Sequence, residues 1–199
     1  MVCKEEVVPL VTLWSKAFAL RKGEVNVAAL VENQNPRFSI PKLAYNFKLY
    51  DKDNILITER SGVTFANANE RLLIFESQIA VGERIPVRAF IEFRPPLWER
   101  LKKAQGQLPV SVRQQQLVQG DAPQLTARMQ NNGVRPLYDL TVLALIVDKD
   151  EDAVAVSSTF VNTLPAGSDS ELTFTWPAAF NREAVAASLY PRIDRTKEQ

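Results

Sequence analysis

The chain has 199 residues, of which 46% are hydrophobic and 24% are charged, and its formal net charge is +1. These values are typical of a soluble globular protein, and so small a net charge produces no overall field that would attract nucleic acid or an anionic membrane. The sequence contains no histidine and a single cysteine, Cys3, which excludes an intrachain disulfide, a thiolate metal cluster and any mechanism that needs an imidazole base.

Alternating apolar and polar residues predict β-strands throughout the first half of the chain. Leu43, Tyr45, Phe47 and Leu49 alternate with more polar neighbours, as expected for a strand with one buried face. Clusters of turn-forming residues, such as the one at 33–36, separate the strands. The strands expected in this half cover residues 25–31, 43–50, 55–58, 71–78 and 87–93.

Residues 98–107 are expected to form a linker that contains one or two helical turns. Two prolines precede this segment, and proline is favourable at the start of a helix. Trp98 and Leu101 are three positions apart and would share one side of such a helix. We expect Trp98 to be buried where the two halves of the chain meet, with Arg100 facing solvent or an acidic group. Trp98, Leu101 and Arg100 are therefore the candidate partner or interdomain residues.

The second half of the chain repeats the first at an offset of 97 to 99 residues. Asp51-Lys52-Asp53 follows one strand pattern, and Asp148-Lys149-Asp150 follows its counterpart. A repeat of this length is domain-sized and can bury a core of its own. The pattern predicts an all-β protein with two tandem β-sandwiches of one topology, at residues 8–97 and 108–195. The strands expected in the second half cover residues 125–131, 140–147, 153–157, 171–176 and 186–193.

Asp148, Asp150 and Asp152 are the candidate metal ligands. Their alternate spacing resembles the opening of an EF-hand calcium loop. The glycine of that loop is missing, because Ala153 follows Asp152, and no bidentate glutamate stands at the twelfth position. Asp and Asn also stabilise turns by bonding to their own backbone. We expect a solvated hairpin turn and no cofactor, with calcium as the alternative.

Other kinds of chemistry find little support in the sequence. Phosphate-binding and hydrolase motifs are absent, and the basic residues around the linker are too few for a nucleic-acid interface. Two carboxylates across a cleft could hydrolyse a glycoside, but the sequence does not single out any pair. We therefore expect a protein that is not an enzyme and does not bind nucleic acid. The glutamates considered for such a pair are Glu59, Glu70, Glu76, Glu83 and Glu92.

The segment Phe47-Lys48-Leu49-Tyr50-Asp51 resembles the Phe-x-Leu-Tyr-Asp signature of the FxLYD family. The resemblance implies that the sandwiches are immunoglobulin-like and carry no catalytic residues. The expected fold is therefore two tandem immunoglobulin-like β-sandwiches joined by the short helical linker. The second half departs from the signature at residues 144–148 and instead matches the late loop of the family at residues 164–167.

The first half is also similar to hypothetical envelope proteins of small uncultivated bacteria, in which a membrane helix and a Cys-rich segment precede tandem units. This similarity implies an extracytoplasmic ectodomain, attached to a membrane only through a segment absent from this chain. Cys3 would then be the last trace of the Cys-rich segment. An exposed terminal thiol is the simpler interpretation of Cys3, because no apolar stretch of a lipoprotein signal precedes it.

Two functions follow from these observations. The first is a non-enzymatic structural, spacer or adhesion and assembly module of a bacterial cell envelope, whose partner is another protein or a cell-surface component. The alternative is a carbohydrate- or peptide-binding module, possibly assisted by calcium.

Overall fold

The computed structural model describes residues 6–196, and these residues form β-strands and no helix. All pairings between strands that we describe are antiparallel, so the predicted all-β class is confirmed. In the described part of the chain, no helix has the length and apolar character to cross a membrane.

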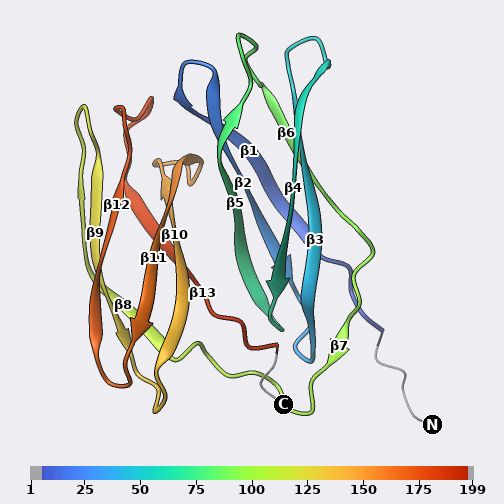
Figure 1. Cartoon of the computed structure of the whole chain (residues 1–199), viewed down its shortest axis with the longest axis vertical. Coiled ribbons are helices and arrows are strands. Elements are labelled where there is room, and N and C mark those ends of the chain that lie inside the picture. Colours follow the sequence, from blue (N-terminus) through green and yellow to red (C-terminus); the bar gives the residue numbers. More distant parts are fainter. Residues whose placement is uncertain (1–5, 197–199) are drawn as a thin grey trace. The chain divides into compact units, whose positions relative to one another are not determined.

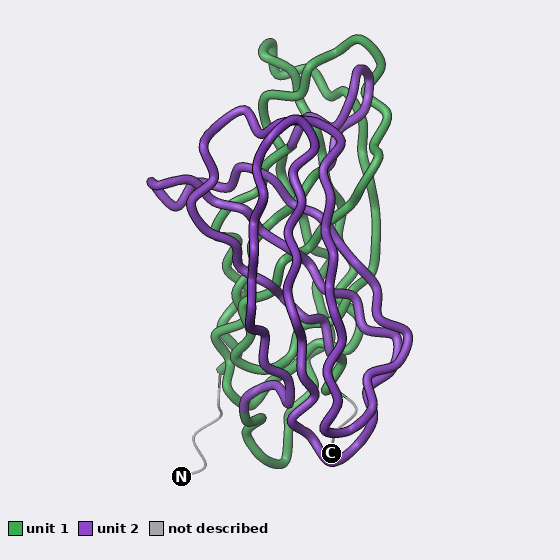
Figure 2. The backbone as a smooth tube through the Cα atoms, turned by 90° about the vertical axis from the view of Figure 1, so that its left-hand side faces the viewer, with its two compact units in different colours: residues 1–17, 27–106, 194–199 green, residues 18–26, 107–193 purple. Residues whose placement is uncertain are grey.

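The chain divides into two compact units, shown in two colours in Figure 2. Of the described residues, unit 1 contains 6–17, 27–106 and 194–196, and unit 2 contains 18–26 and 107–193. The tip of the first hairpin is thus grouped with unit 2, and the C-terminal segment is grouped with unit 1.

Unit 1 is built from a three-stranded sheet of the order β1-β2-β5 and a four-stranded sheet of the order β4-β3-β6, in which the short β7 also pairs with β3 (Figure 1). The apolar side chains of β3 form part of the core of unit 1. Leu43 and Phe47 are completely buried, as are Val27, Val31 and Leu72 of the β1-β2-β5 sheet. The apolar alternation seen in the sequence therefore marks the core face of β3. The strands are β1 (Val11–Arg21), β2 (Glu24–Asn33), β3 (Phe38–Tyr50), β4 (Leu56–Ala66), β5 (Glu70–Ala80), β6 (Arg88–Phe93) and the short β7 (Glu99–Arg100).

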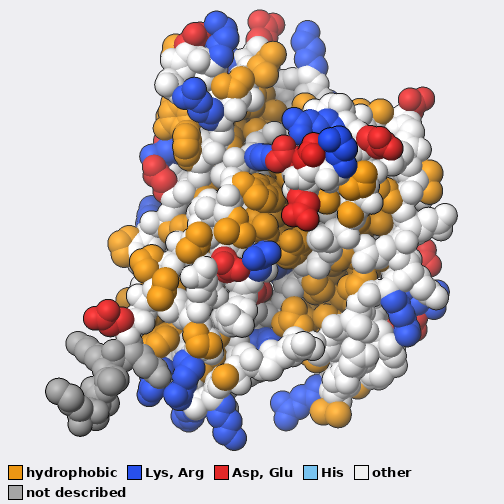
Figure 3. Space-filling view, turned by 180° about the vertical axis from the view of Figure 1, so that it is seen from behind, with side chains coloured by type: hydrophobic (Ala, Val, Ile, Leu, Met, Phe, Trp, Pro, Cys, Tyr) orange, Lys and Arg blue, Asp and Glu red, His pale blue; other side chains and the backbone are white. Residues whose placement is uncertain are grey.

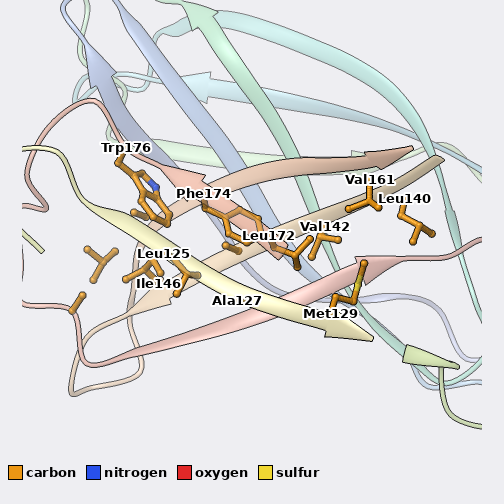
Figure 4. Close-up of a cluster of buried hydrophobic side chains, with 14 of the residues drawn as sticks. Leu125, Ala127, Met129, Leu140, Val142, Ile146, Val161, Leu172, Phe174 and Trp176 are labelled. Atoms are coloured by element: carbon orange, nitrogen blue, oxygen red, sulfur yellow. The ribbon is translucent and has the colours of Figure 1, made fainter. Parts of the chain in front are cut away.

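Unit 2 has two sheets with the orders β8-β9-β12 and β11-β10-β13, which is the strand order of unit 1 repeated. Its core draws on both sheets, as Figure 4 shows, with Leu125 and Phe174 from one sheet packing against Val142 and Ile146 from the other. The sequence repeat is therefore a repeat of topology. The strands are β8 (Val110–Val118), β9 (Gln124–Asn131), β10 (Leu137–Val147), β11 (Ala153–Leu164), β12 (Asp169–Thr175) and β13 (Ala186–Arg192).

The expected helical linker is wrong. The segment 98–107 has no helical turn, and its ordered part is β7, which pairs with β3 at Phe38 and Ser39. The next residue continues the contact, because the Leu101 amide donates to the Arg37 carbonyl at 2.8 Å. A helix of one or two turns fixes several residues for very few hydrogen bonds, whereas an extended segment gains partners at once by adding to an existing strand.

One completely buried asparagine fastens a loop in each unit. Asn33 Nδ2 donates to the carbonyls of Phe38 at 2.8 Å and Asn67 at 2.7 Å. Asn131 Nδ2 does the same with the carbonyls of Arg135 at 2.8 Å and Leu164 at 3.0 Å. In each case the side-chain oxygen accepts the amide of the residue two positions later. The turn clusters noted in the sequence thus contain a buried polar anchor.

In unit 1 this anchor extends into a clasp that holds both ends of the described chain. Asn35 pairs with the backbone of Val8, donating to its carbonyl at 2.7 Å and accepting its amide at 2.8 Å. Asn67 Oδ1 accepts the Arg195 amide at 2.9 Å, and Gln105 Nε2 donates to the Arg195 carbonyl at 2.7 Å. Three polar side chains thereby fix the N-terminal segment, the segment after β7 and the C-terminal segment on unit 1.

Candidate functional site

The aspartates that begin the two repeated turns have the same backbone contacts. Asp51 Oδ1 accepts the amides of Asp53 at 3.0 Å and Ile55 at 2.9 Å. Asp148 Oδ1 accepts the amides of Asp150 and Asp152, both at 3.0 Å. In each turn, the aspartate carboxylate therefore accepts hydrogen bonds from two backbone amides of the same turn, in place of backbone carbonyls.

An arginine completes the turn in unit 2. Arg182 Nη1 donates to Asp148 Oδ2 at 3.1 Å and to Asp152 Oδ2 at 3.2 Å. Burial raises the pKa of Asp148, but the hydrogen bonds from Arg182 and from the two turn amides outweigh it, so the pKa lies below its usual value. Asp150 is exposed and lies 3.1 Å from Lys149 Nζ. All three candidate metal ligands thus already form an ion pair, two of them with Arg182 and one with Lys149.

Residues 6–196 contain no group of three or more His, Cys, Asp or Glu side chains arranged to hold a metal ion. A cation at this turn would compete with Arg182 for the same carboxylate oxygens. Cys3, the remaining residue singled out for its chemistry, lies outside the described residues.

The candidate partner residues of the linker all lie in unit 1. Leu101 is buried, with 4% of its surface exposed, so its apolar side chain is used within the fold. Trp98 is half-buried and Arg100 is exposed. A role for Trp98, Leu101 and Arg100 toward a partner or between the units stays a prediction.

A polar network that the sequence did not reveal lies on the outer face of the β4-β3-β6 sheet. Asn46, from the middle of β3, pairs across the strands with Ser61 and Glu92. Its amide Nδ2 donates to Glu59 Oε2 at 2.8 Å, and its Oδ1 accepts from Ser61 Oγ at 2.9 Å. The orientation of the Asn46 side chain is thereby fixed by two neighbours on β4.

A salt bridge continues this network toward β6. Lys48 Nζ lies 2.8 Å from Glu92 Oε2, and the Glu92 side chain remains 60% exposed. The hydrogen bond to Glu92 raises the pKa of Lys48, and the charges of Glu92 and Glu59 add to this effect against burial. The lysine is therefore a cation held on the sheet, and its acceptor still faces solvent.

The network borders a hollow of about 560 Å³ in unit 1. Small or apolar side chains occupy part of its surface, namely Ala44, the half-buried Phe93 and Val63, which is 66% exposed. Tyr45 and Gly62 also border it. The remaining lining residues are polar, namely Asn46, Glu59, Ser61, Glu92 and Arg94.

The corresponding face of unit 2 has a different composition. Asn46 corresponds to Leu143 and Lys48 to Leu145, each 97 positions later. Leu143 pairs with Ser158 and Tyr190, and Leu145 pairs with Val156 and Ser188. Leu143, Leu145 and Val156 are 5%, 4% and 1% exposed. The two sheets therefore share a strand order, but the residues of the polar network in unit 1 correspond to buried apolar residues in unit 2.

One face of the molecule is drawn with its side chains coloured by type in Figure 3. On the face seen in Figure 3, hydrophobic groups reach the surface among acidic and basic groups of both signs. Scattered exposed apolar residues are normal for folded proteins, so they do not mark a site by themselves. The hollow stands out because its polar groups are bonded to one another.

Comparisons with known proteins identify no family for this chain. No family model and no curated protein sequence matches it. Among solved structures, red sea bream transglutaminase is 11% identical, with 94% of this chain and 31% of that chain covered and a TM-score of 0.29. The exo-chitosanase CsxA of Amycolatopsis orientalis is 14% identical, with 76% and 22% covered and a TM-score of 0.27.

A β-glucuronidase from glycoside hydrolase family 2 is 12% identical, with 86% of this chain and 24% of that chain covered and a TM-score of 0.27. The present chain spans less than a third of each of these three proteins.

Proposed function

We propose that this chain is a non-enzymatic module of two immunoglobulin-like sandwiches, which serves as a spacer or as an adhesion and assembly element. We place it in the extracytoplasmic part of a bacterial cell-envelope protein, where it contacts another protein or a cell-surface component. The observation that carries the proposal is the repeat itself, because the same strand order occurs twice with the same internal anchors.

The use of the polar side chains supports this proposal. The buried asparagines bond to loop carbonyls, and Asp51 and Asp148 bond to the amides of their own turns. These groups stabilise the scaffold and leave its outer faces to vary between the units. Because one fold can support many functions, the outer faces are where binding would differ.

Mechanical unfolding of single molecules tests the spacer function. A chain of two sandwiches should unfold in two cooperative events when it is pulled from its ends. The extension for unit 2, residues 107–193, should be roughly 300 Å, given about 3.4 Å for each residue of extended chain. A single event, or a gradual extension at low force, would contradict two independently folded spacer units.

The proposed location requires a separate measurement. Antibodies against the purified chain should label intact source cells without permeabilisation. Labelling that appears only after the cells are opened would contradict an extracytoplasmic location, and it would leave the unfolding experiment unaffected.

The binding-module alternative is favoured by one observation, the polar hollow on the β4-β3-β6 sheet of unit 1. A module with this hollow would attach a larger protein to a carbohydrate or peptide. Calcium assistance is a further option, for which titration with calcium before and after chelation is the direct test.

A further inference from the structure

We propose that the hollow on the outer face of the β4-β3-β6 sheet is a binding site for a neutral saccharide. The proposal rests on the proposed adhesion function, for which it names a ligand class. The site itself lies entirely in unit 1. Its residues come from β3, β4 and β6 and from Arg94, which directly follows β6 and whose amide donates to the Ala44 carbonyl at 3.1 Å.

The hydrogen-bonding groups of the hollow are preorganised. Asn46 is held by Glu59 and Ser61, and Glu92 is held by Lys48. Each carboxylate keeps acceptor positions beyond the bond that it already makes, and the guanidinium of Arg94 has five donors. Neighbouring positions on adjacent strands are about 5 Å apart, a spacing comparable with the width of a sugar ring. Alternating donors and acceptors at this spacing suit a ligand with several hydroxyl groups.

The charge around the hollow favours a ligand without charge. The lining contains one cation, Arg94, and two carboxylates, Glu59 and Glu92. Lys48 lies beside the hollow, 2.8 Å from Glu92, and offsets the charge of that carboxylate. An anionic ligand would meet the carboxylates, and a cationic ligand would meet Arg94. A neutral polyol can accept from Arg94 and donate to the carboxylates at the same time.

The hollow also offers apolar contact. Val63 is 66% exposed, and it borders the hollow together with Ala44 and the half-buried Phe93. Sugar rings present C–H groups on their faces, and burial of such apolar surface is favourable. A shallow site with a small apolar area and a set of oriented polar groups therefore fits one or two sugar units.

The face that carries the hollow differs between the two units. Asn46, Lys48 and Glu59 correspond to Leu143, Leu145 and Val156, which are buried, whereas the face in unit 1 reaches solvent at Glu92 and Val63. The bonded polar groups of unit 1 are therefore accessible to a ligand.

The test uses the whole chain on an array of immobilised neutral, sialylated and sulfated oligosaccharides. Binding to at least one neutral oligosaccharide is expected, and calorimetry with the same compound in solution should confirm it at concentrations up to about 10 mM. Asn46→Ala and Arg94→Ala should each weaken this binding about tenfold, as expected for the loss of one hydrogen-bonding group. NMR titration should shift the Asn46 side-chain amide and the Ala44 methyl group.

Matched controls lie on unit 2. Glu171→Gln and Arg113→Ala alter exposed residues of β12 and β8 and should leave binding unchanged. Asn46→Ala removes hydrogen bonds within the sheet, so its melting temperature is measured first to show that it folds. Glu92→Gln is a second site variant, which removes the charge of Glu92 and preserves the shape of its side chain. Absence of binding to every neutral oligosaccharide, preference for anionic ones, or binding that survives all three site variants would overturn the proposal. Two normal mechanical unfolding events alongside such a result would leave the spacer function intact.

Discussion

The hydroxyl of Tyr45 donates a hydrogen bond of 2.8 Å to Oε1 of Glu76, which joins the two sheets of unit 1. The other oxygen of Glu76 accepts from Arg60 Nε at 2.9 Å. Tyr45 also lies opposite Gly62 on β4, and its ring occupies the space that a side chain at position 62 would need. An aromatic ring that covers a strand glycine is a known way to complete a sheet.

Gly62→Ala should destabilise the protein. An added Cβ would lie 2.3 Å from the Tyr45 hydroxyl oxygen and 2.8 Å from Glu76 Oε1, so the ring has to move and its bond to Glu76 is disturbed. We expect a loss of about 1–3 kcal/mol in the free energy of unfolding, the usual cost of overpacking. Gly106→Ala is the control, because a Cβ there meets no atom within 4 Å. Equal unfolding midpoints for the two variants in denaturant would contradict this account.

Tyr45 should lose its proton at a higher pH than an ordinary tyrosine side chain does. Burial raises the pKa of Tyr45, and the hydrogen bond and the charge of Glu76 raise it further against the opposing charge of Arg60. A raised pKa in the folded state stabilises the protein fully below the unfolded value of about 10, and this contribution is lost as the pH rises toward the folded value. The near-ultraviolet absorbance of phenolate should therefore show one late step, which Tyr45→Phe removes. Persistence of the late step in that variant would assign it to another tyrosine.

Asn33→Ala and Asn131→Ala should destabilise units 1 and 2, respectively. Each substitution leaves two carbonyls and one amide without their side-chain partner inside the protein. The expected cost is about 1–3 kcal/mol for each buried group that stays unpaired. Chemical denaturation followed by NMR would show which unit unfolds first. Asn132→Ala is the neighbouring control, because Asn132 is exposed and should change stability by less than about 0.5 kcal/mol.

The turn at Asp148 should make unit 2 sensitive to acid. The pKa of Asp148 lies below its usual value, because Arg182 and two turn amides outweigh the effect of burial. The contact therefore stabilises the fold above the unfolded pKa of about 3.9 and is lost as the pH falls through the lower folded value. The difference in melting temperature between the wild type and Asp148→Asn should shrink as the pH is lowered through this range. A difference that does not change with pH would rule out this linkage.

Calcium should bind at this turn no more tightly than about millimolar, the weak end of protein calcium sites. Arg182 Nη1 already contacts Asp148 and Asp152, at 3.1 and 3.2 Å. Calorimetry with calcium is the measurement. Saturable micromolar binding that disappears in Asp150→Ala would overturn this prediction.

The strands of the core could be predicted because their signal is local. The alternation of Leu43, Tyr45, Phe47 and Leu49 is visible in a few consecutive residues, and it marks the buried face of β3. The long strand β1 was not among the strands expected. In the sequence, only Trp14, Phe18 and Leu20 share an alternate face there. In the structure, the residues of β1 are exposed or half-buried without a regular alternation.

The site depends on pairings between distant residues. Asn46, Glu59 and Glu92 meet only because β3 pairs with β4 on one side and with β6 on the other, in one particular register. Glu59 and Glu92 were two of the five glutamates considered for a carboxylate pair. No feature of the sequence distinguished these two from the other three. The signal that could have found the face was the repeat, because polar residues at 46 and 48 correspond to leucines at 143 and 145.

The clasp that holds Arg195 on unit 1 has a consequence for how the protein is made. Asn67 and Gln105 bind a segment that the ribosome produces only after all of unit 2. The first unit therefore cannot acquire its full set of contacts during its own synthesis, although most of its strands leave the ribosome early. Unit 2, whose main segment is continuous from 107 to 193, is complete before the last residues of unit 1 exist.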